Sequence, residues 1–178
     1  MLIARELRKT NIAEYILYMW QIEDLLRAFS FNNELIKKQL VDRFNTDEKL
    51  SSEIFTWYTN LSLMMEKEHV LEKGHLQVFT NLVNDLYEFH IKMIETRKDM
   101  DYVYLYERNR QAIIELVQKS NTVNEIEACF LALYGLMILK IKNSEISDQT
   151  RITAEQLARL VGHLSVRYLQ YENDDFEF

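Results

Sequence analysis

Apolar residues recur along most of the chain at the three-to-four-residue spacing of amphipathic helices. The clearest case lies between Asn11 and Phe29, where Asn11 is a suitable N-cap and Glu14 stands three residues later, as in a capping box. Leu17 and Trp20 lie on further sides, so this helix is apolar on most of its surface and is expected to be central. Its broad apolar face is formed by Tyr15, Met19, Ile22, Leu26 and Phe29.

The same spacing predicts six further helices. One of them, the run YVYLY at Tyr102–Tyr106, also alternates like a strand, but no second strand-like run exists to pair with it, so we expect a helix there. The third helix is expected to end at Gly74. The six segments are approximately 34–44, 50–74, 75–96, 102–117, 126–141 and 153–171.

Short polar residues mark the expected starts of several helices. Such residues accept hydrogen bonds from backbone N–H groups that have no partner inside the helix. A Glu or Gln three residues later strengthens the signal. The expected starts are Asp99 or Asp101, the pair Thr122 and Glu125, and the pair Thr153 and Gln156.

The composition favours an all-α fold in a single domain. The 178 residues include no proline and only three glycines, so little interrupts long helices and hairpin turn signals are missing. We expect one irregular bundle of about seven helices over residues 1–171. Residues 172–178 are expected to form an acidic, solvated C-terminal tail.

The segment 126–141 is apolar nearly all round and is expected to be the second central helix. Gly135 in its middle costs roughly 1 kcal/mol relative to alanine. Close approach of a neighbouring helix or large side chain would explain why glycine is kept. Trp20 is the neighbour that we consider.

Charge and cysteine content limit the classes of function. A formal charge of −7 disfavours non-specific nucleic-acid binding, which requires a basic surface. The single Cys129 excludes an internal disulfide and is expected to be an inert core thiol. Basic and acidic residues interrupt the first ten positions, and the most apolar run is about twelve residues long against the ~20 that span a bilayer. We therefore expect a cytoplasmic protein without membrane insertion.

A candidate ligand site lies beside the apolar face of the first long helix. Glu14, Tyr18 and Gln21 share one narrow wedge, and with Asp24 they could converge on a small polar ligand. The alternative is structural, because such residues often satisfy helix ends or pair locally. Asp24 or Glu23 with Arg27 would form an ordinary ion pair on the helix surface.

A candidate interface combines tyrosine and arginine. Tyr102, Tyr104, Tyr106 and Arg108 have the composition of an interface hot spot, although half of an amphipathic helix must face the core.

No motif points to catalysis, a metal or a cofactor. Glu66 with His69 and Glu72 with His75 have the Glu-x-x-His spacing of di-iron bundles, but they lie six residues apart in one charged segment. His90 and His163 have no ligand-type residue at a suitable spacing and are expected to be partly buried. Phosphate-binding loops and nucleophile elbows are also missing, so an enzyme is not favoured.

The run LRKTNIAEYILYMWQIEDLLRA, residues 7–28, resembles the opening of an uncharacterised family of all-helical Bacteroidetes proteins known as domain of unknown function 4924. Tyr18–Leu25 carries most of the likeness, and the length and the tyrosine-rich, acidic end also fit. The resemblance implies an α-helical cytoplasmic protein and supplies no activity, substrate or site.

These observations favour a non-enzymatic helical interaction or scaffold protein that self-associates as a homodimer. The alternative is a small-molecule-binding protein, or an enzyme of unfamiliar type, with a polar pocket around Glu14, Tyr18, Gln21 and Asp24.

Overall fold

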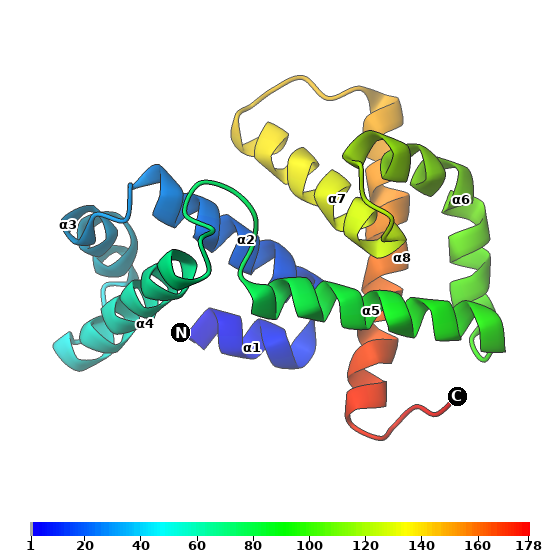
Figure 1. The fold of residues 1–178 in the computed structure, drawn as a ribbon, viewed down its shortest axis with the longest axis horizontal. Coiled ribbons are helices and arrows are strands. Elements are labelled where there is room, and N and C mark those ends of the chain that lie inside the picture. The colour runs from blue at the N-terminus through cyan, green and yellow to red at the C-terminus, as the bar shows by residue number, and fades with distance from the viewer. Residues whose placement is uncertain (1) are drawn as a thin grey trace. The chain divides into compact units, whose positions relative to one another are not determined.

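The fold is all-α, as the sequence predicts. The structure is a computed structural model that describes residues 2–178, and within this range it contains eight α-helices and no strand (Figure 1). The short first helix is additional to those that the hydrophobic spacing predicts. The helices are α1 (Leu2–Thr10), α2 (Ile12–Ala28), α3 (Asn33–Ile36), α4 (Glu48–Lys67), α5 (Gln77–Thr96), α6 (Met100–Ser120), α7 (Glu125–Ile141) and α8 (Asp148–Glu172).

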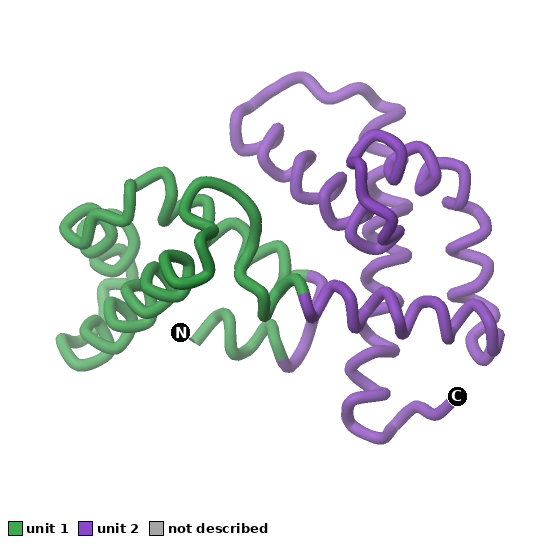
Figure 2. The backbone as a smooth tube through the Cα atoms, in the orientation of Figure 1, with its two compact units in different colours: residues 1–8, 14–80 green, residues 9–13, 81–178 purple. Residues whose placement is uncertain are grey.

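The chain divides into two compact units (Figure 2). Unit 1 comprises the described residues up to Arg8 and residues 14–80. Unit 2 comprises residues 9–13 and 81–178. Both α2 and α5 begin in one unit and continue in the other.

Unit 1 is built from most of α2, α3, α4 and the segment that joins α4 to α5. The predicted helix over 34–44 is in fact α3 followed by a π-helical turn, Lys37–Val41, and a 3₁₀ turn, Asp42–Phe44. Asn45 ends this stretch in the left-handed conformation, with φ 47°. The core of unit 1 includes the fully or almost fully buried side chains of Met19, Ile22, Leu26, Ile36, Val41, Ile54, Tyr58, Met65 and Leu76.

Helix α4 ends before Gly74, contrary to the prediction. Its last residue is Lys67, Glu68 forms the C-cap, and His69 has a positive φ of 58°, which terminates the helix. Residues 68–76 therefore form a connecting segment. Gly74 lies inside this segment with φ 85°, a conformation that glycine adopts without strain.

Unit 2 packs α6, α7 and α8 against one another and includes most of α5. Its core contains Phe89, Tyr102, Ile113, Phe130 and Leu164. The start of α2 also belongs to unit 2: the amide of Ala13 donates to Oγ of Ser165 at 3.2 Å, and Ser165 donates to Oδ1 of Asn11 at 3.3 Å. A hydroxyl on α8 thus satisfies one of the N-terminal amides of α2.

One of the three predicted helix caps is observed, and the other two helices are capped by different residues. Asp99 caps α6, as one of the two predicted choices, and accepts from the amide of Tyr102 at 3.0 Å. Asn124 rather than Thr122 caps α7, since it accepts from the amide of Glu127 at 2.8 Å. Ser147 rather than Thr153 caps α8, six positions earlier, because residues 148–152 are helical but all exposed and so have no buried face that would mark them as helix.

The C-terminal tail is not wholly solvated. After α8 ends at Glu172, the rings of Phe176 and Phe178 lie 6.0 and 5.1 Å from the ring of Phe89. The guanidinium of Arg167 also lies 5.6 Å from the Phe176 ring. We predicted a solvated tail from its acidic residues, but its two phenylalanines pack against Phe89.

Among residues 2–178, no single helix is long and apolar enough to cross a membrane. Helices α6 and α7 meet the length and composition criteria only as a pair, and that pair is bent by 81°.

Candidate functional site

The four residues of the predicted ligand site do not line either of the two grooves described below. Glu14 is exposed, while Tyr18, Gln21 and Asp24 are half-buried. Tyr18 forms a hydrogen bond with Tyr58, and Asp24 accepts from Nη1 of Arg27 at 2.8 Å. Burial raises the pKa of the Tyr18 phenol. The groove beside α4 and the groove between α6 and α8 are lined by other residues, so a ligand role for these four stays a prediction.

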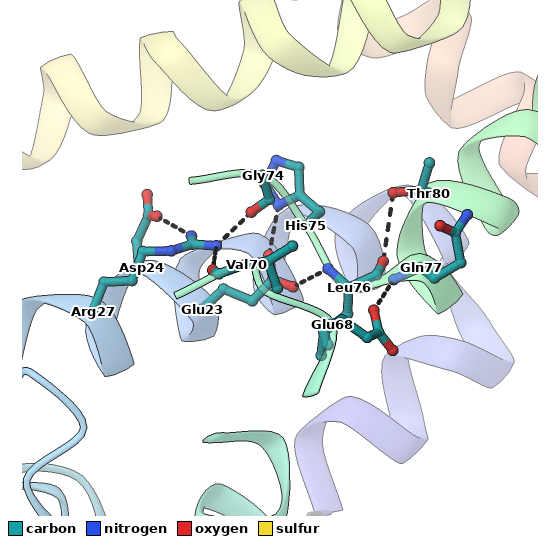
Figure 3. Close-up of polar contacts among 10 residues, drawn as sticks. All are labelled: Glu23, Asp24, Arg27, Glu68, Val70, Gly74, His75, Leu76, Gln77 and Thr80. Carbon is teal, nitrogen blue, oxygen red and sulfur yellow. Dashed lines mark hydrogen bonds and ion pairs between the residues drawn. The ribbon is translucent and has the colours of Figure 1, made fainter. Parts of the chain in front are cut away.

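The buried polar residue of α2 is Glu23, which is 0% exposed. Its two carboxylate oxygens hold the end of the segment 68–76 (Figure 3): Oε2 accepts from Nδ1 of His75 at 2.5 Å, and Oε1 accepts from the amide of Leu76 at 2.8 Å. The imidazole of His75 stacks on Trp20, with ring centroids 4.0 Å apart and planes 11° from parallel. We call Trp20, Glu23, Arg27 and His75 the α2 clamp.

Arg27 holds the middle of the same segment. Its Nη2 donates to the carbonyls of Val70, at 3.0 Å, and Gly74, while Asp24 fixes its Nη1 (Figure 3). The carboxylate of Glu68 accepts from the amide of Gln77 at 2.6 Å, at the first residue of α5. Charged side chains thus satisfy several backbone groups of a segment that has no regular structure.

The α2 clamp corrects the expected role of Glu23. The Asp24–Arg27 ion pair is confirmed, but Glu23 is buried and does not pair with Arg27 on the surface. The position of Glu23 in the sequence indicated its burial, because Glu23 lies four residues after Met19 and three before Leu26, within the apolar face. A carboxylate there needs partners from elsewhere in the fold. The arrangement anchors a segment and leaves no free group for chemistry on Glu23.

The tyrosine group of α6 divides between core and surface. Tyr102 and Tyr106 are buried in unit 2, whereas Tyr104 is 64% exposed and Arg108 is exposed. Only Tyr104 and Arg108 could contribute to an interface, and whether they do so stays a prediction.

The two buried tyrosines belong to a polar network around His90. Nδ1 of His90 lies 2.6 Å from the Tyr102 hydroxyl, and Nε2 lies 3.3 Å from Oε2 of Glu125. Burial, followed by the hydrogen bond and negative charge of Glu125, raises the pKa of Tyr106 to about 12. His90 is therefore fully buried rather than partly buried as expected, and it has a carboxylate partner from α7 that its sequence neighbours did not reveal.

Cys129 lies beside this network and is 0% exposed. Burial and the negative charge of Glu125 raise the pKa of its thiol to about 12. The expectation of a buried, unreactive thiol is consistent with this placement, because the thiolate is the reactive form.

The most apolar helix, α7, is incompletely covered. Ile126, Ala128, Cys129 and Phe130 are buried, but no residue after Phe130 is. One side of its second half carries only apolar residues, all half-buried or exposed, and Leu139 is 41% exposed. We call this side the α7 face; by helical spacing it comprises Leu131, Ala132, Gly135, Ile138 and Leu139.

Gly135 has no close neighbour. A Cβ built on it would meet no atom within 4 Å, so no neighbour within unit 2 approaches it closely. Trp20 lies in unit 1, where it stacks on His75, and its expected packing against Gly135 stays a prediction. The glycine lies in the middle of the α7 face, which is open at this point.

Comparison with known proteins adds a family and no activity. No curated protein and no solved structure gives a significant match. Across the described residues, no group of three or more His, Cys, Asp or Glu side chains is placed to hold a metal ion. A family model, described as a domain of unknown function (DUF4924), matches residues 1–175. The chain therefore belongs to the DUF4924 family.

Proposed function

We propose that this protein is a helical interaction protein that pairs with a second copy of itself through the α7 face. The single observation that carries the proposal is the incomplete burial of this face on the most apolar helix, where Gly135 and Leu139 are exposed and Leu131, Ala132 and Ile138 are half-buried. Exposed apolar residues that gather on one face often mark an interaction site. A second copy is the occupant that we argue for below.

The α7 face suits a two-fold interface. In such an interface the same patch contacts itself, so it has to be self-complementary. If two α7 helices cross antiparallel at Gly135, Leu131 of each copy faces Leu139 of the other. Ala132 then faces Ile138 in the same way. The small side chains at the centre allow the two backbones to approach closely.

The ends of α7 have opposite charges. Its first turn carries Glu125 and Glu127, its last turn carries Lys140, and its C-cap is Lys142. Antiparallel pairing brings the acidic end of each helix toward the basic end of its partner. Parallel pairing would place like charges together, which is unfavourable. This complementarity favours a second copy over a partner of unrelated charge.

Leu139→Lys is expected to convert the dimer into a monomer. A lysine at this 41%-exposed position is solvated in the single chain but would be buried against the partner. The mass is measured by light scattering and analytical ultracentrifugation over a dilution series. The matched control is Leu35→Lys on α3, a position with 43% exposure, which should remain dimeric. A monomeric mass for the unmodified chain at high concentration would contradict the proposal.

Gly135→Ala is expected to stabilise the single chain and weaken the dimer. Alanine is favoured over glycine by roughly 1 kcal/mol inside a helix, and the added Cβ meets no atom in the chain. The same Cβ would separate two helices that cross at this point. Urea unfolding of the dilute protein measures the first effect, and the dissociation constant measures the second.

Gly162→Ala on α8 is the control, since its Cβ also meets nothing within 4 Å. It should give a comparable gain in unfolding free energy with an unchanged dissociation constant. Equal dimer affinity for both alanine variants would argue against a crossing at Gly135.

A further inference from the structure

A second feature of unit 2 is a groove between α6 and α8 with a volume of about 550 Å³. This volume is within the range of small-molecule sites. The groove shares no residue with the α2 clamp or the α7 face. Its lining is Leu105 from α6 and Arg159, Gly162, His163, Val166 and Arg167 from α8.

The basic residues of the groove stand on one side of α8. Arg159, His163 and Arg167 follow one another at intervals of four residues, which places them one above another along the helix. Arg159 is exposed, and no described residue accepts a hydrogen bond from it. The apolar part of the groove is supplied by Leu105 and Val166, the latter 53% exposed.

Asp99 holds two of these three side chains in place. Its side chain is only 5% exposed, and Oδ2 accepts from Nε2 of His163 at 2.7 Å and from Nε of Arg167 at 2.5 Å. Because Nε2 of His163 donates its hydrogen to Asp99, His163 borders the groove and is not counted as a donor to a ligand. Arg167 also donates from Nη1 to Gln170 at 2.9 Å, while Nη2 has no acceptor in the described part of the chain.

We infer that this groove is a binding site for a small organic monocarboxylate, with the carboxylate held by Arg159 and Nη2 of Arg167 and the aliphatic body lying on Leu105 and Val166. Guanidinium groups match the planar geometry of a carboxylate and can donate two hydrogen bonds to it. Fixing Arg167 in advance reduces the entropy that binding has to overcome.

The charge balance selects a monoanion. The charges of the two arginines and of the Asp99 carboxylate sum to +1 around the groove. A carboxylate neutralises this charge, whereas a phosphate monoester would exceed it. The inference is independent of self-association, because the groove contains no residue of the α7 face.

Hexanoate is the probe for this site, because it combines one carboxylate with a short aliphatic chain. Titration of the full chain is followed by the ring signals of His163 in heteronuclear NMR and by calorimetry. We expect saturable binding with a shift of the His163 signals. Arg159→Gln, at an exposed position that leaves the fold intact, should weaken binding at least tenfold. Hexanol, which has no charge, should not bind.

Arg151→Gln is the matched control, since Arg151 lies on the same helix, is 59% exposed and pairs with Asp148 outside the groove. It should bind hexanoate as the unmodified chain does. Three results would overturn the inference: no saturable shift of His163, equal affinity in the Arg159→Gln variant, or tighter binding of hexyl phosphate than of hexanoate. Binding of an acidic peptide in place of hexanoate would assign the groove to a protein partner instead.

Discussion

Replacing Glu23 by alanine is expected to lower the free energy of unfolding of unit 1 by about 3 kcal/mol. The substitution removes a fully buried carboxylate and leaves the amide of Leu76 without its acceptor at the start of α5. It also removes the partner of His75, whose ring covers Trp20. Glu23→Gln retains an acceptor for Leu76 and should cause a smaller loss.

Tryptophan fluorescence during urea unfolding measures this effect selectively. Both tryptophans of the chain, Trp20 and Trp57, lie in unit 1, so their emission follows that unit. Glu53→Ala on α4 is the control within unit 1, because Glu53 is exposed and its removal should change stability by less than about 0.5 kcal/mol. Equal unfolding midpoints for the Glu23 and Glu53 variants would show that the α2 clamp contributes nothing.

Asp99→Asn is expected to destabilise unit 2 by about 2 kcal/mol at neutral pH. Burial raises the pKa of the Asp99 carboxyl, but hydrogen bonds from His163, the Tyr102 amide and Arg167 outweigh it and lower the pKa from 3.8 to about 2. Asparagine retains the cap of α6 but not the charge. The variant therefore isolates the ionic part of the interaction.

The pH dependence has a definite sign. Because the folded state lowers the pKa of Asp99, its stabilisation is complete above about pH 4 and is lost as the pH falls toward 2. The difference between the unmodified chain and Asp99→Asn should thus decrease to about half near pH 3. Urea unfolding followed by circular dichroism between pH 3 and pH 7 measures it.

Asp101→Asn is the control, because Asp101 is exposed in the first turn of the same helix. Its effect on stability should be small and should vary little with pH. A constant difference between the unmodified chain and Asp99→Asn across the range would contradict the ionic role of Asp99.

Most helices were predictable because local patterns determine them. The three-to-four spacing from Leu76 to Met93 matches α5, and Asp99 caps α6 as expected. The failures occur where a competing contact replaces the one that the pattern predicts. Thr122 has the spacing of a capping box, yet its hydroxyl donates to the side chain of Glu127 and leaves the cap to Asn124. The spacing of apolar residues also could not show that residues 37–44 form a wider π turn followed by a tighter 3₁₀ turn.

The polar clusters were less predictable, because each combines residues far apart in the sequence. Glu23 meets a histidine 52 residues away, and Asp99 meets His163 across 64. A single sequence shows that a carboxylate stands on an apolar face, which predicts a buried partner, but not which residue that partner is. The exposure of the α7 face could not be predicted for the same reason. An apolar helix is expected to be buried, and only the positions of its neighbours show where it is not.

The hydrogen bond from Ala13 to Ser165 joins residues that are 152 positions apart. During synthesis, the amide at the start of α2 therefore cannot meet its acceptor until α8 has left the ribosome. Unit 1, whose residues all precede position 81, has no such delay. The order in which the chain emerges thus separates the two units in time: the α2 clamp can close while α8 is still being made, whereas the contact of Ala13 with unit 2 requires α8.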